Sequence, residues 1–407
     1  MNHRTSSRCC AIVGGGAAGF FAALHLKASC PGLEVTILER SSHVLAKVGL
    51  SGGGRCNCTN TFAGVTDLSA VYPRGHRLLR RLFHVFGPKD AYEWFESHGV
   101  KLATQPDNCV FPASQRSQTI IDCFISEAQR LGVIVKTGVK IQSMEQLQSY
   151  DYVIVTIGGQ PHRQALQWLA DMGHEIEMPV PSLFTFSIAD EGLRSLAGTV
   201  CSDAVLQLPH TRFRSSGPLL VTHWGVSGPA TLKLSSYAAR WLSEQQYKAS
   251  LVVNWLGMPE TGVAELLATM VADHRLKQVS TIAPDGLSSR LWTHLLKRSL
   301  AAKSCVRWGE LGKKDFNRLV AVLTADTYNI VGRAPFKDEF VTCGGVSLRS
   351  VVPQTLESRV CPGLFFAGEV LDIDGVTGGF NFQAAWTTAF VVAKAIAEKE
   401  SQVNEKP

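Results

Sequence analysis

CCAIVGGGAAGFFAAL, residues 9–24, places an apolar segment before three consecutive glycines and a fourth glycine three positions later. Gly14, Gly16 and Gly19 fit the pattern G-x-G-x-x-G, in which the first glycine permits a tight turn, the second lets a pyrophosphate approach the backbone, and the third packs a helix against a strand. The free N–H groups at the start of that helix attract an anion. The stretch therefore predicts a strand, a turn and a helix that together bind a dinucleotide.

The dinucleotide-binding interpretation requires an acidic residue after the second strand, and the sequence has one there. Residues 34–38, EVTIL, form a second strand-like segment, and Glu39 follows it, twenty positions after Gly19. An acidic residue at this spacing binds a ribose hydroxyl of the dinucleotide. An ordinary surface glutamate is the alternative, but the order of strand, glycines, helix, strand and acid favours the ribose contact.

The composition is that of an ordinary globular protein of 407 residues, of which 45% are hydrophobic and 18% are charged. This length predicts two or three domains with a sizeable core. The net charge of +6 is small for the length. The densest basic cluster falls on an expected amphipathic helix and consists of Arg74, His76, Arg77, Arg80 and Arg81. We interpret this cluster as a solvated helix face, so no nucleic-acid partner is expected.

The eleven cysteines predict neither disulfides nor a metal site. They are odd in number and scattered, several lie in apolar segments, and no C-x-x-C spacing occurs. The apolar stretch near residue 10 is the glycine motif itself and lacks the continuous core of a secretory signal. No uncharged apolar run reaches the roughly 20 residues of a membrane span. We expect reduced thiols, a cytoplasmic location and no membrane span, and the oligomeric state stays open.

The pattern of expected strands and helices changes twice along the chain. Residues 1–180 alternate apolar strands with helices, as in parallel α/β sheets. Short alternating segments with Pro and Gly predict an inserted β-rich domain over 181–258, and helical periodicity predicts a small helical subdomain over 259–329. Residues 330–407 return to the first pattern. We predict an α/β fold whose Rossmann-type nucleotide domain is discontinuous and consists of residues 1–180 and 330–407.

Two further glycine-rich loops extend the expected site. SGGGRCNCTN, residues 51–60, combines glycines that allow close backbone approach with the directed donors of Arg55 and Asn57. DIDGVTGGFN, residues 372–381, precedes an expected helix from about 381 to 398, whose N-terminus is again receptive to an anion. A flexible linker is the alternative for 51–60, but its polar ending favours a binding loop.

These motifs resemble those of the BaiN/RdsA family of FAD-dependent flavoproteins over nearly the whole chain. The most specific matches are the glycine motif at 14–19, the SGGGRCN-x-TN block at 51–60 and the AGE-x-LD-x-DG-x-TGG block at 367–379. Shorter matches are Lys47, F-P-x-S at 111–114, TH-x-G-x-SGPA at 222–230 and T-x-GGV at 342–346. The resemblance implies non-covalent FAD, a discontinuous Rossmann-type domain, an inserted β-rich domain and a helical subdomain.

The resemblance also implies which residues hold FAD. The pyrophosphate would meet the turn at Gly16 and Ala17, the adenosine ribose would meet Glu39, and adenine would meet the backbone of Val139. The flavin side would be lined by Lys47 and by the run Gly53, Gly54 and Arg55. The other implied contacts are Gly158 at a strand end, Glu369 near the ribityl and pyrophosphate groups, and the backbone N–H groups of Gly379, Asn381 and Phe382 near the flavin ring.

One departure from the family concerns the segment after Gly158 and Gly159. Family members usually have a longer polar loop there, whereas this chain passes almost directly into PHRQAL, residues 161–166. Because that loop borders the flavin region in relatives, the substrate of a relative cannot be carried over to this chain.

The expected activity is that of an FAD-dependent oxidoreductase on a small organic molecule, with NAD(P)H as transient electron donor. An oxidase of an amine-type substrate that uses oxygen is one alternative, and a non-catalytic flavoprotein that docks RNA or protein through residues 74–81 is another. His223 is the first candidate for proton transfer, because an imidazole titrates near neutral pH. A packing role beside Trp224 is the alternative. Arg55 and Cys56 rank behind His223, and no metal is expected.

Overall fold

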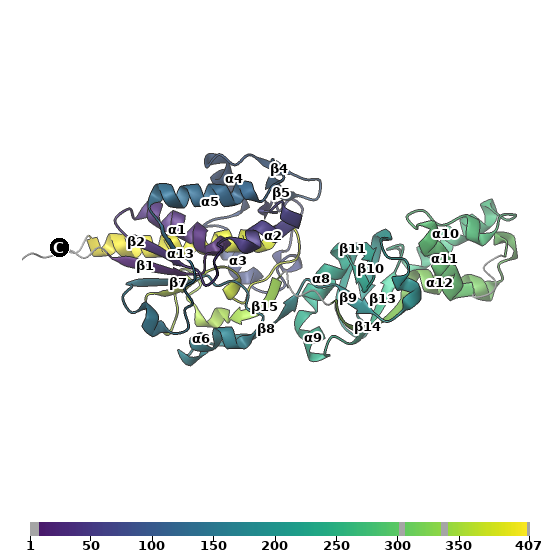
Figure 1. Cartoon of the computed structure of the whole chain (residues 1–407). Coiled ribbons are helices and arrows are strands. Elements are labelled where there is room, and N and C mark those ends of the chain that lie inside the picture. The colour runs from purple at the N-terminus through teal and green to yellow at the C-terminus, as the bar shows by residue number, and fades with distance from the viewer. Residues whose placement is uncertain (1–7, 301–305, 335–340, 405–407) are drawn as a thin grey trace, which may run out of the picture. The chain divides into compact units, whose positions relative to one another are not determined.

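The protein is described by a computed structural model that covers residues 8–300, 306–334 and 341–404. The chain divides into two compact units, one formed by residues 1–180 and 341–407 and the other by residues 181–340 (Figure 1). The first unit is built from both ends of the chain, as the sequence predicts for the nucleotide domain. The second unit is an insertion between them.

A parallel five-stranded sheet forms the centre of the first unit, in the order β16-β7-β1-β2-β6. Its strands are β1 (Cys9–Val13), β2 (Glu34–Leu38), β6 (Ile134–Lys136), β7 (Tyr152–Val155) and β16 (Leu364–Phe366). Strand β1 pairs in parallel with both β2 and β7, and Cys10 lies opposite Val35 on one side and Tyr152 on the other. Strands β1, β7 and β16 are almost wholly buried, which explains their continuous apolar sequences.

Helix α1, which follows β1, covers one face of this sheet together with the helices that pack on it. Helices α5 and α13 pack on α1 (Figure 1). Aromatic side chains of the three helices contact one another. The rings of Phe21 on α1 and Trp386 on α13 have centroids 5.1 Å apart. The helices of this unit are α1 (Ala17–Ser29), α2 (Ala46–Gly54), α3 (His76–Leu82), α4 (Pro88–Ser97), α5 (Gln118–Leu131), α6 (Gln167–Asp171) and α13 (Phe380–Asn404).

The amphipathic helix expected around the basic cluster at 74–81 is short in the structure, and a separate helix follows it. Helix α3 ends at Leu82, and α4 begins at Pro88. A proline at the first helical position cannot continue a preceding helix, because it lacks an N–H and its ring would clash with that helix. The Asp90 carboxylate accepts the N–H of Gly87 at 2.6 Å and so caps the new helix.

Two smaller sheets complete the first unit. Strands β3 (Thr59–Asn60), β5 (Cys109–Pro112) and β4 (Leu102–Thr104) form an antiparallel sheet. Strands β8 (Ile176–Ser182) and β15 (Val341–Val346) pair with each other. The chain therefore leaves this unit and re-enters it along neighbouring strands.

The inserted unit contains a closed β-barrel with the strand order β10-β11-β12-β9-β14-β13. Its strands are β9 (Phe186–Ile188), β10 (Val200–Gln207), β11 (Arg214–Val221), β12 (Gly225–Ser227), β13 (Ala249–Asn254) and β14 (Asp326–Arg333). Short helices α7 (Glu191–Arg194), α8 (Pro229–Tyr237) and α9 (Ala239–Glu244) join these strands. Helices α10 (Glu260–Asp273), α11 (Ser289–Leu300) and α12 (Lys313–Ala325) lie between β13 and β14 in the chain.

The barrel and the three longer helices share one apolar core. Buried residues of this core include Trp255 beside the barrel, Trp292 on α11 and Leu319 on α12. The boundary predicted at 258–259 therefore separates elements that pack together. The return to the nucleotide domain predicted at 330 falls inside β14, whose Ile330 lies opposite Ala249 and Ile188, so this strand belongs to the barrel.

The predicted fold class is confirmed: a Rossmann-type α/β domain with an inserted β-rich segment and a helical region. Among the helices of the described ranges, none is both long and apolar enough to cross a membrane.

Candidate functional site

The turn between β1 and α1 depends on two of the motif glycines for close packing. Gly14 has φ of 114°, and a Cβ there would lie 2.5 Å from the carbonyl oxygen of Thr156. A Cβ on Gly19 would lie 2.0 Å from the carbonyl oxygen of Gly14. By contrast, a Cβ on Gly16 would meet nothing within 4 Å. Gly14 and Gly19 thus set the backbone, and Gly16 faces the open space that a pyrophosphate needs.

The N-terminus of α1 is receptive to an anion. Gly16 occupies the cap position in extended backbone, no side chain caps it, and the first turn contains no acidic residue. The first N–H groups of the helix, beginning at Ala17, therefore point toward the open space beside Gly16 with the positive end of the helix dipole.

Glu39 lies at the carboxyl edge of the sheet, next to this turn. One carboxylate oxygen accepts the N–H of Gly15 at 2.8 Å, and the other accepts the N–H of Ser41 at 2.8 Å. The N–H of Val139 donates to the carbonyl oxygen of Glu39 at 2.8 Å. The structure thus brings together the residues predicted for pyrophosphate, ribose and adenine, at the edge where open α/β sheets bind ligands.

Three further predicted contacts lie in the same unit, and an ion pair joins two of them across a long stretch of sequence. The Lys47 ammonium on α2 lies 2.9 Å from one carboxylate oxygen of Glu369, just after β16. The other oxygen accepts the N–H of Thr342 at 2.9 Å. Gly158, with φ of 70°, lies just after β7, and a Cβ there would be 3.9 Å from Glu369. These three predicted contacts are therefore neighbours.

The loop predicted over 51–60 begins where α2 loses its helical backbone. Helix α2 starts at Ala46, and its backbone departs from helical geometry at residues 51–53. Gly53 and Gly54 have φ of 68° and 83° and face open space, so their peptide groups are accessible. The Arg55 guanidinium lies 4.5 Å from the centroid of the Phe111 ring and donates to the carbonyl oxygen of Gly52 at 3.1 Å.

The C-terminal glycine loop is held by its own side chains. The amide of Asn381 accepts the N–H of Gly375 at 2.8 Å and donates to the carbonyl oxygen of the same residue at 2.9 Å. Gly379 approaches β3 so closely that a Cβ would lie 2.2 Å from the carbonyl oxygen of Thr59. The Phe382 ring stacks on Trp386 with centroids 5.4 Å apart. The side chains of Asn381 and Phe382 thus shape the loop, which leaves their backbone N–H groups as the predicted cofactor contacts.

Three polar residues support these loops: Asn57, which was predicted only as a donor of the 51–60 loop, and Asn60 and Thr156, which were not predicted as site residues. With its amide oriented to satisfy both groups, Asn57 accepts the N–H of Gly379 at 3.1 Å, and Asn60 donates to the carbonyl oxygen of Gly378 at 2.9 Å. The Thr156 hydroxyl donates to the carbonyl oxygen of Gly14 at 2.8 Å. Both asparagines belong to the 51–60 motif, and that motif could have identified them as site residues from the sequence. Thr156 offered none, because a threonine ending a strand is unremarkable in sequence.

The proton-transfer candidate lies in the inserted unit. His223 and Trp224 are the two central residues of a tight hairpin in which Thr222 and Gly225 exchange backbone hydrogen bonds of 2.7 and 3.2 Å. Both side chains are exposed, so the imidazole is not packed in a core.

The structure gives no favourable setting for a reactive cysteine at position 56. Cys56 and Cys58 are buried, and both are free thiols. Burial raises the pKa of Cys56 to about 12, so the reactive thiolate is scarce at neutral pH. In the described ranges, no group of three or more His, Cys, Asp or Glu side chains is placed to hold a metal ion.

The basic cluster at 74–81 is only partly a solvated face. Arg74 precedes α3 and forms an ion pair with the fully buried Asp374. Arg77, Arg80 and Arg81 are exposed on α3, as the sequence predicts. Arg80 lies 3.9 Å from Asp67, so part of the charge on this face is locally balanced.

Comparison with known proteins places this geometry in a family. The profile of the HI0933-like protein Rossmann domain matches residues 8–395. The chain is 26% identical to the 3-dehydro-bile acid delta(4,6)-reductase of Clostridium scindens, across 95% of this chain and 98% of that protein. It is also 26% identical to the ribosomal RNA dihydrouridine synthase of Escherichia coli, across 96% of this chain and 98% of that protein.

A solved structure shares the fold. The 3-ketosteroid delta1-dehydrogenase from Sterolibacterium denitrificans has a TM-score of 0.50 and 11% identity, over 96% of this chain and 99% of that chain. The family match spans most of the chain and includes every motif on which the resemblance to the BaiN/RdsA family rests. The chain belongs to the HI0933-like Rossmann-domain family and is an FAD-dependent oxidoreductase.

Proposed function

We propose that this chain reduces a carbon–carbon double bond conjugated to a carbonyl group in a small organic molecule, with NAD(P)H as the reductant of its FAD. The observation that carries the proposal is the chemistry common to the two named relatives. One is named as a reductase of the delta(4,6) positions of a 3-dehydro-bile acid. The other is named for dihydrouridine, a uridine whose ring double bond beside a carbonyl has been saturated.

The residues at the carboxyl edge of the sheet suit the adenosine and pyrophosphate parts of FAD. Open space beside Gly16 and the free N-terminus of α1 fit a pyrophosphate, and the Glu39 carboxylate and Val139 backbone lie beside them. We assign the pyrophosphate to Gly16 and Ala17, the ribose to Glu39 and adenine to Val139. Because Glu39 already accepts two backbone N–H groups, it remains an oriented acceptor for a ribose hydroxyl.

The remaining contacts are assigned to the flavin half of the cofactor. Accessible peptide groups at Gly53 and Gly54 supply donors, and the Lys47–Glu369 pair and Gly158 lie beside one another. We assign the N–H groups of Asn381 and Phe382 in the C-terminal loop to the flavin ring side, where donors stabilise negative charge on the reduced ring. The N–H of Gly379, which was also predicted as a contact, donates to Asn57 instead.

The bound flavin supplies the hydride, and a protein group must then supply the proton that completes saturation of the double bond. We assign this proton to His223, because histidine is the side chain most suited to proton transfer and the imidazole at this position is exposed. Replacing His223 with Ala should leave the flavin content unchanged and slow substrate reduction about 100-fold or more. The matched control is His84→Ala, an exposed histidine between α3 and α4 that has no assigned role. Equal rates for the two variants would remove His223 from the mechanism.

Anaerobic stopped-flow absorbance tests the proposed reaction directly. The FAD-loaded protein is mixed with NADH or NADPH, and then with a steroid that carries a 3-oxo-4-ene group. We expect a nicotinamide to bleach the flavin and the enone to restore its colour, while a saturated 3-oxo steroid does not. If nicotinamides fail to bleach the flavin but an amine substrate does, and oxygen restores the colour, the protein is an oxidase instead.

A further inference from the structure

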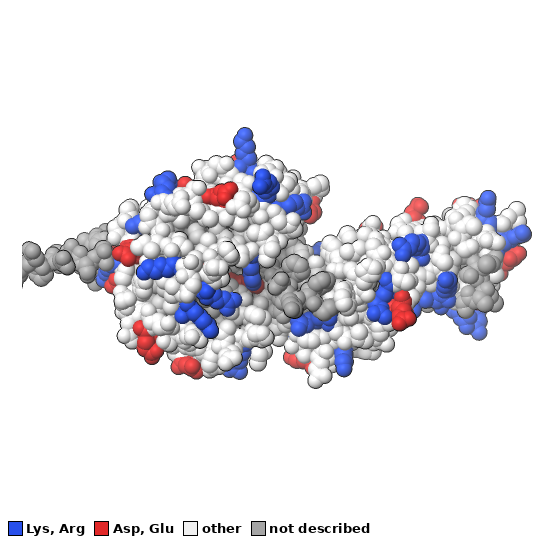
Figure 2. All heavy atoms as spheres, viewed as in Figure 1, with Lys and Arg blue, Asp and Glu red and all other residues white. Residues whose placement is uncertain are grey.

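The helical region of the inserted unit carries most of the net positive charge of the chain. Residues 259–325 contain ten Lys and Arg against six Asp and Glu, whereas the rest of the chain contains 30 against 28. Figure 2 shows blue side chains prevailing over red ones where Figure 1 places α10, α11 and α12. An excess of this kind attracts an anionic partner.

An apolar side chain lies between two cations in this region. Leu276, just after α10, is 81% exposed, more than any other large hydrophobic side chain of the described residues. Arg275 and Lys277 on either side of it are exposed, and neither forms an ion pair with a carboxylate of the described residues. Single exposed leucines are common on protein surfaces. Here the apolar side chain and the two cations are available to the same partner.

Backbone hydrogen bonds fix the loop that carries Leu276. The carbonyl oxygen of Arg275 accepts the N–H of Gly309 at 3.0 Å, and that of Lys277 accepts the N–H of Trp308 at 3.0 Å. Trp308 is fully buried in the core of the unit. Leu276 therefore stands on a supported backbone, and the exposure of its side chain is a property of the fold.

Further cations belong to the segment that pairs with this loop and to the helix that follows it. Arg307 is exposed and lies opposite Gln278 in a short antiparallel pairing. Helix α12 begins with Lys313 and Lys314, which are both exposed. Because cations at a helix N-terminus oppose the helix dipole, helix stability does not explain these two lysines.

Residues 273–278 and 306–314, which we call the cationic tip, contain five Lys and Arg against two Asp and Glu. The acidic residues are Asp273 and Glu310, and the Glu310 carboxylate accepts the N–H of Arg307 at 3.1 Å. Trp308 is the one Phe, Tyr or Trp of these segments, and it is buried. The cationic tip therefore offers positive charge and an aliphatic side chain, but no exposed aromatic ring of these types.

We propose that the cationic tip binds the surface of an anionic lipid membrane. Leu276 enters the boundary between headgroups and acyl chains, and Arg275 and Lys277 contact lipid phosphates on either side of it. Proteins lie on membranes by this combination of apolar insertion and attraction to anionic lipids. A nucleic acid would use the cations but would gain nothing from Leu276, because bases stack on ring faces. The proposal does not depend on the reductase activity, since membrane binding requires no turnover.

Sedimentation with lipid vesicles tests this surface in the FAD-loaded full chain. The vesicles contain phosphatidylcholine alone, or phosphatidylcholine with about one third of phosphatidylglycerol, and binding is measured at several salt concentrations. We expect binding to the anionic vesicles only, and we expect salt to weaken it. Arg275→Gln with Lys277→Gln should weaken this binding about tenfold or more and reduce its salt dependence.

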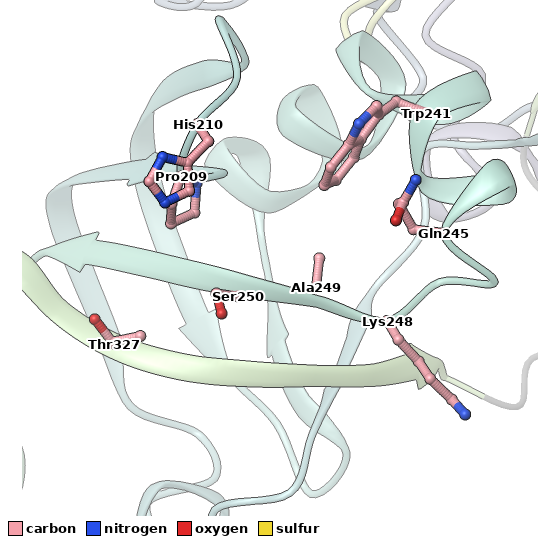
Figure 3. Close-up of a pocket in the computed structure, with 8 residues that line it drawn as sticks. All are labelled: Pro209, His210, Trp241, Gln245, Lys248, Ala249, Ser250 and Thr327. Atoms are coloured by element: carbon pink, nitrogen blue, oxygen red, sulfur yellow. The ribbon is translucent and has the colours of Figure 1, made fainter.

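The matched charge control is Arg214→Gln with Lys248→Gln on the barrel. Both residues are exposed, and the Lys248 side chain points away from the cavity between His210 and Trp241 (Figure 3). This variant removes the same charge and should change vesicle binding by less than about threefold. Equal effects of the two double variants would mean that only net charge matters, and would overturn the proposal.

Variants of Leu276 separate apolar insertion from charge. Leu276→Ser should weaken binding to anionic vesicles at least about fivefold at every salt concentration, because salt does not screen apolar insertion. Leu276→Trp should retain binding, and brominated lipid should quench the fluorescence that this substitution adds. The control is Val200→Ser, at a 52% exposed position on β10, which should leave binding unchanged. Full binding by Leu276→Ser, equal binding to neutral and anionic vesicles, or no binding at low salt would each overturn the proposal.

Discussion

At the scale of single residues, three glycines of one motif have different physical roles. Gly14 and Gly19 leave no room for a side chain, because a Cβ on either would lie within 2.5 Å of a carbonyl oxygen. Gly16 faces open space and has extended backbone with φ of −90°, which any residue adopts. The packing of β1 against α1 and the binding of a ligand can therefore be separated by mutation.

Gly19→Ala should destabilise the protein by at least about 2 kcal/mol, since the new methyl group displaces α1 from the turn. Gly16→Ala should change the stability of the flavin-free protein by less than about 0.5 kcal/mol but weaken FAD retention. Urea unfolding measures the first quantity, and flavin absorbance after gel filtration measures the second. A Gly16→Ala protein that keeps its full flavin content would show that the pyrophosphate does not lie at this residue.

His25 on α1 is a buried titratable group among aromatic rings. Its Nε2 has no hydrogen-bond partner in the structure, and its ring lies 4.5 Å from Phe21 and 4.9 Å from Phe390 between centroids. Burial, followed by the charge of His98, lowers the pKa of His25 to about 4 from its usual 6.5. Because the unfolded chain binds this proton at higher pH than the folded chain, acid favours unfolding.

The stability of the protein should accordingly fall as the pH falls from about 6.5 to about 4, by about 3 kcal/mol from this group. His25→Phe removes the titration while keeping an aromatic ring in place. Its free energy of unfolding, measured at several pH values, should lose that portion of the pH dependence. An unchanged pH profile would mean that His25 has a normal pKa.

At the scale of elements, buried polar contacts join loops that the sequence separates widely. Arg74, before α3, pairs with Asp374 in the C-terminal glycine loop, and Asp374 has no exposed surface. Lys47 on α2 pairs with Glu369 after β16. These contacts fix the glycine loops relative to the sheet edge, so loop position depends on long-range ion pairs as well as on local turns.

Asp374→Ala should destabilise the protein by about 3–5 kcal/mol, because it leaves the Arg74 guanidinium buried without its partner. The double variant Arg74→Leu with Asp374→Leu removes both charges and should be clearly more stable than the single variant. Chemical denaturation of the three proteins gives the comparison. If single and double variants lose the same stability, the pair contributes through shape rather than charge.

At the scale of the whole molecule, the inserted unit begins and ends on paired strands. Strands β8 and β15 lie side by side at the two ends of residues 181–340. The N–H of Ser347 donates to the carbonyl oxygen of Glu175 at 2.8 Å, which keeps these strands together within the first unit. The insertion can therefore be removed without separating the ends that the first unit must join.

Replacing residues 184–338 with a short glycine–serine linker should give a folded protein that retains FAD. The same protein should lose substrate reduction, because His223 is removed with the insertion. Visible absorbance and circular dichroism measure the first outcome, and anaerobic reoxidation by the enone measures the second. A deleted protein that folds but binds no FAD would place cofactor contacts in the inserted unit.

The amino-acid sequence is sufficient to predict the nucleotide-binding turn, the acid after the second strand, the discontinuous α/β domain and the β-rich insertion. Patterns of adjacent residues predict these features: glycine spacing, apolar runs and changes of periodicity. Only the tertiary structure shows that β14 closes the barrel and that Arg74 and Lys47 meet carboxylates about 300 residues away. The physical reason is that such contacts arise from packing between distant segments, which local periodicity does not encode.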